Sequence, residues 1–177
     1  MALFPRTKSL GRLALAMFGM GAAATAALAQ PTPPTQLGAF GDWEAYKGTD
    51  ARGTVCYVIS APKTKEPAAA KRGQIYFLVS TWPGSSVANE PSIMIGYPFK
   101  DGSTATVEVG ADTFEFFTKE DGAWLNTKPD EGRLVAAMRA SGELTVKGMS
   151  RRGTLTTDTY SLKGISAALD KLAEGCK

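Results

Sequence analysis

Short runs of β-branched and aromatic residues, separated every ten to fifteen residues by glycine, proline or an Asp-Gly pair, most limit how this chain can fold. Such runs, joined by tight turns, are typical of antiparallel β proteins. We therefore expect a mainly β fold: a single-domain antiparallel sandwich or barrel-like sheet with a short internal helix and a C-terminal helix. The predicted strands are Asp42–Lys47, Thr54–Ala61, Gln74–Trp82, Ser92–Tyr97, Thr104–Val109, Thr113–Thr118, Glu143–Gly148 and Thr154–Leu162.

Two Asp-Gly pairs mark predicted hairpin turns. Lys100-Asp101-Gly102-Ser103 separates two predicted strands, and Glu120-Asp121-Gly122-Ala123 follows another. Tight hairpin turns need residues with positive φ, which glycine adopts without strain. We expect Gly102 and Gly122 to hold that conformation.

Two segments replace the strand period with a helical one. Pro129-Asp130-Glu131-Gly132 precedes an apolar helical face, which predicts a short helix over Arg133–Ala140. Near the C-terminus a second apolar stripe predicts a helix that covers the sheet as a lid, with Ser166 available to cap its start. The residues of this stripe are Ile165, Ala168, Leu169, Leu172 and Cys176.

The first 29 residues have the layout of a secretory signal peptide. Three basic residues precede an uncharged apolar run from Leu13 to Leu28, and Ala27-Leu28-Ala29 supplies the small residues of a cleavage site. A permanent transmembrane helix is the alternative, but Gly19 and Gly21 dilute a run that is already short for a span. We expect cleavage after Ala29, no stable membrane span afterwards, and a periplasmic or secreted protein.

Removal of this segment changes the charge balance of the chain. The full sequence has 20 Lys+Arg against 17 Asp+Glu, and the signal peptide holds three of the basic residues and no acidic one, which leaves 17 against 17. An even balance gives no reason to expect nucleic acid as a partner. The domain boundaries that we expect are 1–29 for the signal peptide, 30–39 for a Pro-rich flexible leader and 40–177 for the β domain.

The two cysteines, Cys56 and Cys176, are predicted to form a disulfide. Paired thiols oxidise in an exported protein, and a single intramolecular pairing is available. The bond would close a loop of 121 residues, from 56 to 176 inclusive, for which the chain-entropy model gives about 5 kcal/mol of stabilisation. Two free thiols or an intermolecular bond are the alternatives.

The chain contains no histidine, which removes the usual general base and the commonest metal ligand. No spacing resembles a zinc site, a calcium loop or a Gly-rich phosphate loop. Carboxylate pairs, Asp112 with Glu115 or Asp130 with Glu131, are what a histidine-free glycosidase would need. We expect no enzyme, no catalytic residues, no metal and no cofactor; the alternative is a carboxylate- or tyrosine-based enzyme acting in the periplasm.

The segment from Lys147 to Arg152 is predicted to form a basic turn. Its cations, Lys147, Arg151 and Arg152, are candidate contacts for an anion or a partner, because guanidinium groups and exposed amides bind carboxylates and phosphates. A solvated hairpin is the alternative. The tryptophans and tyrosines present a similar choice between a binding face for sugar or peptide and the filling of a β core.

Several local motifs together resemble one known family. They are Phe40-Gly41-Asp42-Trp43, Cys56-Tyr57-Val58, Gly96-Tyr97-Pro98-Phe99-Lys100, Ala123-Trp124, Ser150-Arg151-Arg152-Gly153-Thr154, Asp158-Thr159-Tyr160-Ser161-Leu162-Lys163-Gly164 and Cys176. In order and spacing this set is similar to the invasion-associated locus B family, exported proteins of alphaproteobacteria. The resemblance spans essentially the whole mature chain.

The resemblance implies an exported, mostly β single domain from a virulence-associated family whose founding members were tied to invasion of host cells. It supplies no catalytic residues. We expect a non-enzymatic binding or envelope-associated protein on a disulfide-stapled β scaffold. The expected partner is an unknown protein or envelope component, and the expected state is a monomer.

Overall fold

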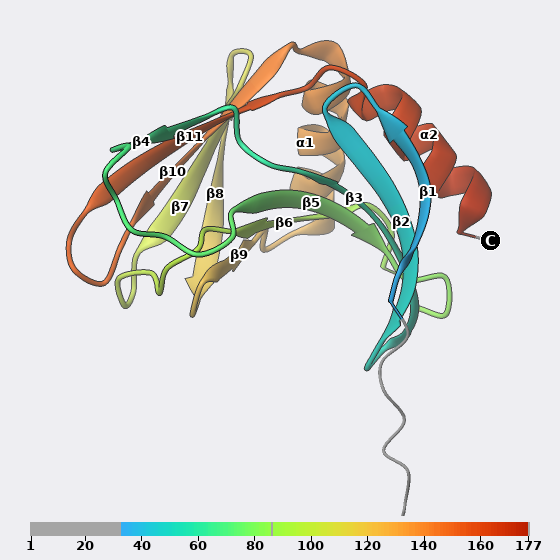
Figure 1. Cartoon of the computed structure of the whole chain (residues 1–177), viewed down its shortest axis with the longest axis horizontal. Coiled ribbons are helices and arrows are strands. Elements are labelled where there is room, and N and C mark those ends of the chain that lie inside the picture. The colour runs from blue at the N-terminus through green and yellow to red at the C-terminus, as the bar shows by residue number, and fades with distance from the viewer. Residues whose placement is uncertain (1–32, 86, 177) are drawn as a thin grey trace, which may run out of the picture. The chain divides into compact units, whose positions relative to one another are not determined.

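The computed structural model describes residues 33–85 and 87–176, which form one antiparallel sheet and two helices (Figure 1). The sheet has eleven strands in the order β1-β2-β3-β5-β6-β9-β8-β7-β10-β11-β4, and it does not close on itself. The predicted mainly β class is confirmed. The strands are β1 (Thr35–Phe40), β2 (Trp43–Asp50), β3 (Gly53–Ser60), β4 (Thr64–Glu66), β5 (Tyr76–Thr81), β6 (Glu90–Met94), β7 (Thr104–Val109), β8 (Asp112–Lys119), β9 (Gly122–Trp124), β10 (Glu143–Met149) and β11 (Leu155–Ser161).

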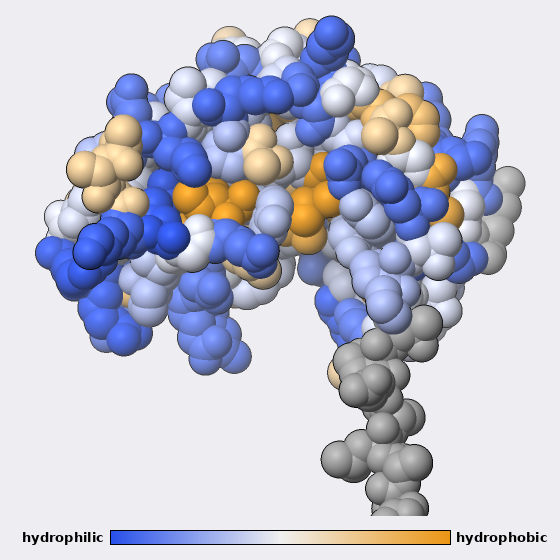
Figure 2. Space-filling model, viewed as in Figure 1, coloured by the Kyte–Doolittle hydropathy of each residue, from blue (hydrophilic) through white to orange (hydrophobic). Residues whose placement is uncertain are grey.

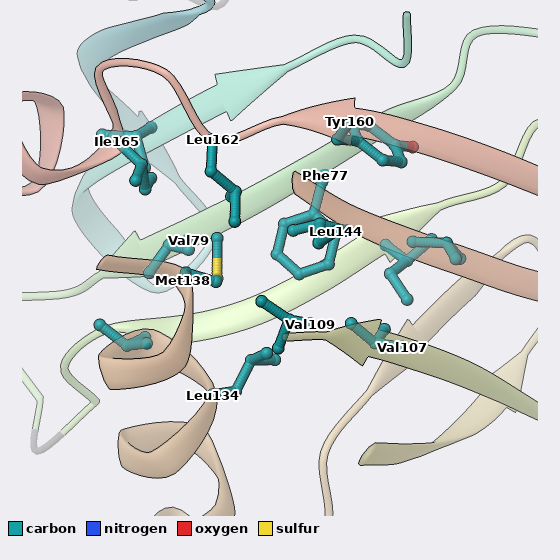
Figure 3. Packing of buried hydrophobic residues seen from close by; sticks show 14 of the residues in the cluster. Phe77, Val79, Val107, Val109, Leu134, Met138, Leu144, Tyr160, Leu162 and Ile165 are labelled. Carbon is teal, nitrogen blue, oxygen red and sulfur yellow. The ribbon is translucent and has the colours of Figure 1, made fainter. Parts of the chain in front are cut away.

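The inner face of the sheet carries the hydrophobic core. Phe77 on β5 lies edge-on to Phe116 on β8 at 6.5 Å and to Tyr160 on β11 at 5.9 Å. Since β5 and β11 are far apart in the strand order, the sheet must curl for these rings to touch. Alternate residues of most strands point into this core, where Figure 3 shows Phe77, Leu144 and Tyr160 close together.

Two helices cover the inner face. Helix α1 (Lys128–Ala140) contacts β6, β7 and β8, and helix α2 (Ile165–Gly175) contacts β1, β2 and β3. Leu134 and Met138 of α1 are fully buried in the core (Figure 3). The apolar stripe predicted for the C-terminal helix is the buried face of α2, as expected of a lid.

The start of α1 and the cap of α2 differ from the sequence-based prediction. Helix α1 begins five residues before Arg133, because the Thr127 hydroxyl accepts a hydrogen bond from the backbone N–H of Asp130 and a proline fits the first turn. Helix α2 is preceded by Gly164 in a left-handed conformation, and the Ser166 side chain makes no cap. The cap prediction for Ser166 is therefore wrong.

Three strands, β1, β4 and β9, were not predicted from the sequence, and β1 lies partly in the expected leader. Strand β1 pairs with β2 over residues 35–40, so residues 35–39 of the segment expected to be a flexible leader belong to the sheet. Strands β4 and β9 have three residues each, too few to show an alternation of apolar and polar side chains. In the turn before β9, Glu120 carries the positive φ of 56° that we expected at Gly122.

The turn between β1 and β2 meets the end of β11 at a seam. The Trp43 indole N–H donates to the Ser161 carbonyl at 2.9 Å, and the Asp42 backbone N–H donates to the Lys163 carbonyl at 3.0 Å. A Cβ atom on Gly164 would lie 1.9 Å from the Phe40 carbonyl oxygen. This close approach explains why glycine stands at position 164, where φ is 94°.

No helix among residues 33–85 and 87–176 is both long and apolar enough to cross a membrane. The expected signal peptide and its cleavage site lie outside the described residues.

Candidate functional site

Residues 67–75 connect β4 to β5 and are called the strap here (Figure 1). Arg72 of the strap donates from Nη1 and Nη2 to the two carboxylate oxygens of Asp158 on β11, at 2.6 and 2.5 Å. Its Nε and Nη2 also donate to the Ile95 carbonyl at 3.1 and 2.7 Å. One guanidinium thus ties the strap both to β11 and to the segment after β6.

The ion pair of Arg72 and Asp158 is buried, with side-chain exposures of 4% and 0%. A buried pair is tolerated when its geometry is good and the remaining polar atoms are hydrogen-bonded. Two-pronged contact with the carboxylate and the additional bonds to Ile95 meet both conditions. These hydrogen bonds fix the strap against β11 in one arrangement, and they make this end of the inner face polar.

Tyr97 lies beside this ion pair. Its ring is 5.1 Å from the Arg72 guanidinium carbon, and its hydroxyl shares a 2.7 Å hydrogen bond with the Thr156 hydroxyl. Burial raises the pKa of Tyr97 above its ordinary value, and the bond to Thr156 opposes that shift. Gly148 leaves room for the ring, since a Cβ atom there would lie 2.8 Å from Phe99 and 3.0 Å from the Tyr97 hydroxyl.

The segment around Tyr97 is held by backbone hydrogen bonds to three other parts of the chain. Gly96 accepts from Gly73 of the strap at 2.8 Å, Phe99 donates to Glu120 at 2.7 Å, and Pro98 accepts from Arg151 at 2.9 Å. The motif Gly96-Tyr97-Pro98-Phe99-Lys100 is thus the junction between the strap, the turn before β9 and the turn after β10. These three hydrogen bonds fix the backbone that carries the side chains of this motif.

Two pockets adjoin at this junction, and Tyr97 lines both. The larger pocket has a volume of about 600 Å³ and is lined by residues that include Glu120, Asp121 and Arg151. The smaller pocket has a volume of about 250 Å³, and its polar lining residues are Lys71, Arg72, Tyr97, Ser150, Arg152, Thr154 and Thr156. Hydrophilic residues predominate at the β4 end of the face drawn in Figure 2.

The structure separates the three candidate anion contacts. Lys147 is in the middle of β10 and pairs with both carboxylate oxygens of Glu108, at 2.7 and 2.8 Å. Arg151 lines the larger pocket, with Asp101 3.8 Å away, whereas Arg152 lines the smaller pocket. Neighbouring arginines thus face different pockets, and Lys147 belongs to neither.

Sequence reasoning missed Arg72 and Asp158 as functional candidates. Asp158 had a usable signal, because it stands between Thr156 and Tyr160 on the face of a predicted strand that turns inward. A charged residue at such a position needs a partner. Arg72 had no such signal in the sequence, because it lies in a loop and only the tertiary structure brings it to β11.

The predicted disulfide is present between Cys56 on β3 and Cys176 at the end of α2, with a Cα–Cα distance of 5.9 Å. Lys47 on β2 adds a contact at the same place, because its ammonium donates to the Gly175 carbonyl at 3.0 Å. The last turn of α2 is therefore fixed to the sheet covalently and by a hydrogen bond.

Three of the four carboxylates weighed for catalysis form ion pairs. Asp130 accepts from Arg133 at 3.0 Å, and Glu131 accepts from Lys128 at 2.8 Å, both within the first turns of α1. Asp112 lies 3.8 Å from Arg133 and is exposed. None of these carboxylates is among the residues that line the two pockets at Tyr97, whereas Glu115 and Asp130 both line a separate pocket beside the start of α1.

The aromatic residues are divided between the core and the surface. Trp43 is fully buried, whereas Trp82 donates its indole N–H to Asp50 at 3.0 Å away from the main core. On the outer face Tyr46 stacks on Tyr57 with ring centroids 5.5 Å apart. Neither alternative, a binding face for sugar or peptide or the filling of a β core, therefore holds for all of the tryptophans and tyrosines.

The fold is similar to that of invasion associated protein b from Bartonella henselae. The crystal structure of that protein aligns with a TM-score of 0.56 over 81% of this chain and 96% of its own length, at 14% sequence identity. At this identity the likeness concerns the fold alone. No protein-family model matches the sequence, and no curated protein matches it.

Proposed function

We propose that this chain is an exported, non-enzymatic binding protein of the bacterial envelope that works in the periplasm or after secretion. The observation that carries the proposal is the bond between Cys56 and Cys176, which joins the last turn of α2 to β3. Such bonds persist in oxidising compartments outside the cytoplasm. The signal-peptide pattern of residues 1–29 agrees with that location.

The binding part of the proposal rests on the strap end of the domain. Binding sites are concave and set on a backing that holds their polar groups in place. Two adjoining pockets meet this description, backed by the buried pair of Arg72 and Asp158. The chain has no histidine, and three of the four candidate carboxylates, Asp112, Asp130 and Glu131, pair with cations, which supports binding without turnover.

The family assignment is the finer part of the proposal. The ordered motifs resemble the invasion-associated locus B family, and the fold is similar to a protein that bears the name invasion associated protein b. We infer membership of that family, and with it a role at the bacterial envelope that extends to contact with host cells. Culture fractionation tests the extension, because a protein retained wholly behind the outer membrane cannot meet a host surface.

Export and oxidation are tested together by expressing the full chain in a bacterium and fractionating the cells. We expect a protein that begins at Gln30, lies in the periplasm or medium, and shows no reaction with a thiol-alkylating reagent before reduction. A matched control that begins at residue 30 and lacks the signal peptide should stay in the cytoplasm with both thiols reactive. Full-length protein in the cytoplasm, with Cys56 and Cys176 reduced, would overturn the proposal.

A further inference from the structure

The smaller pocket has an uneven balance of charge. Lys71, Arg72 and Arg152 line it, and no carboxylate does. Asp158 stands directly behind Arg72 and is fully buried, with both of its oxygens bonded to that guanidinium. Asp158 therefore offsets one of the three cations and leaves two.

The two remaining cations are uncompensated within the part of the chain that the structure describes. Across residues 33–85 and 87–176, neither Lys71 nor Arg152 has a carboxylate within 4.0 Å, whereas Arg151 has Asp101 at 3.8 Å and Lys147 has Glu108 at 2.7 Å. Both uncompensated side chains are exposed, so solvent and a ligand can reach them. Two positive charges without a paired carboxylate therefore line the same small pocket.

Hydrogen-bond donors supplement the two charges. A guanidinium has five N–H groups, and Arg72 uses four of them on Asp158 and Ile95, which leaves one on Nη1 without an acceptor among the described residues. Ser150 accepts the backbone N–H of Thr154 at 3.0 Å, so its own hydroxyl hydrogen is available to donate. Thr154, which also carries a hydroxyl, is another of the residues that line the pocket.

Charge and size indicate the class of ligand. A cavity of about 250 Å³ is smaller than the roughly 300–1,000 Å³ of sites for drug-sized molecules, so it suits a small group. A phosphate monoester carries about −1.5 to −2 charges at pH 7 and three strong acceptor oxygens, whereas a carboxylate carries one charge and two oxygens. The phosphate monoester is the better match for two free cations and several donors.

We propose that the smaller pocket binds the phosphate group of a phosphate monoester, with Arg152 and Lys71 as its charge contacts and Arg72 as the fixed floor. This inference rests on the proposed function, since it names the ligand class of the smaller of the two pockets; the larger pocket, which Arg151 lines, takes no part in phosphate binding. The monoester can belong to a soluble metabolite or to a lipid headgroup, which share this chemistry.

Calorimetric titration of the oxidised protein that begins at residue 30 tests the proposal, with glycerol 1-phosphate as the probe and acetate as the reference anion. We expect saturable binding of glycerol 1-phosphate at one site and at least tenfold weaker binding of acetate. Arg152→Ala and Lys71→Ala should each weaken the affinity for glycerol 1-phosphate by about tenfold or more, since each removes one charge contact. Both residues are exposed, so unchanged circular dichroism and thermal midpoint should accompany that loss.

Arg151→Ala is the matched control, because Arg151 is the adjacent residue, carries the same charge and lines the other pocket. We expect its affinity to stay within about threefold of the unmodified protein, the change that screened surface charge produces. Equal weakening by Arg151→Ala and Arg152→Ala, equal affinity for acetate, or absence of saturable binding would each overturn the proposal.

Vesicles distinguish the two sources of the monoester. Stronger binding to vesicles that contain phosphatidic acid, a monoester, than to vesicles with matched charge from phosphatidylglycerol, a diester, supports a lipid headgroup. Binding of glycerol 1-phosphate without preference between the vesicles supports a soluble ligand. Export and oxidation are measured independently of these titrations, so the two proposals can fail separately. Release of inorganic phosphate from glycerol 1-phosphate would refute the non-enzymatic function but would still support the phosphate site.

Discussion

Arg72 and Asp158 lie 86 residues apart in the sequence and form a buried, two-pronged ion pair at distances of 2.6 and 2.5 Å. The pair anchors the strap to β11, and its Arg72 side chain lines the smaller pocket. It therefore links the stability of the domain to the shape of its candidate binding site.

Removal of one partner of this pair should be costly. Arg72→Met leaves the Asp158 carboxylate buried without a counter-charge, and we expect the free energy of unfolding to fall by about 3–5 kcal/mol in urea denaturation. The double variant Arg72→Met with Asp158→Leu removes both charges and should lose clearly less. A single variant as stable as the double variant would contradict the expected penalty for an unpaired buried carboxylate.

Loss of the disulfide should lower stability by about 2–5 kcal/mol. Cys56→Ser, Cys176→Ser and the double variant each remove the same bond, so the three should unfold at similar denaturant concentrations. Chemical denaturation of the three variants beside the oxidised unmodified protein measures this. An unchanged midpoint in any of them would contradict the covalent link between α2 and β3.

Tyr160 and Tyr97 should respond in opposite ways to the loss of a hydroxyl. The Tyr160 hydroxyl is buried without a hydrogen-bond partner in the described structure, so Tyr160→Phe should leave stability unchanged or raise it by about 1 kcal/mol. The Tyr97 hydroxyl is bonded to Thr156, so Tyr97→Phe should lose about 1 kcal/mol. Thermal unfolding of the two variants side by side checks both expectations.

Stability should fall at alkaline pH. Burial raises the pKa of both Tyr97 and Tyr160, so the folded state keeps protons that the unfolded chain releases near pH 10. The unfolded state then binds fewer protons than the folded state, and the free energy of unfolding decreases as the pH rises above about 10. Denaturation between pH 8 and 11 should show this decrease, with a smaller slope in Tyr160→Phe; equal slopes would contradict it.

Trp43 should contribute to stability through both packing and its bond to Ser161. Trp43→Ala empties a fully buried position beside Phe77 and should lose about 3–5 kcal/mol. Trp43→Phe keeps an aromatic ring but leaves the Ser161 carbonyl without this donor, so an intermediate loss is expected. A folded Trp43→Ala protein of unchanged stability would contradict this account of the core.

The longer strands and both helices could be predicted, because each carries its own periodic pattern. The predicted strand Thr104–Val109 coincides with β7, and the stripe from Ile165 to Leu172 is the buried face of α2. Strand β1 could not be predicted in the same way, since the prolines just before it and Gly38 within it obscure any alternation, and its pairing with β2 supplies the order. The seam between Gly164 and Phe40 is a contact across the fold that no local pattern reveals.

The sequence by itself determined the mainly β class, the helical lid and the one cysteine pairing, because alternation, helical spacing and the presence of only two cysteines are properties of the chain. The tertiary structure decided the site. Arg72 meets Asp158, and Arg151 and Arg152 separate into different pockets, only after the strap has crossed to β11. Charges far apart along a chain acquire partners through the path of the backbone in space, and that path depends on the packing of the whole core.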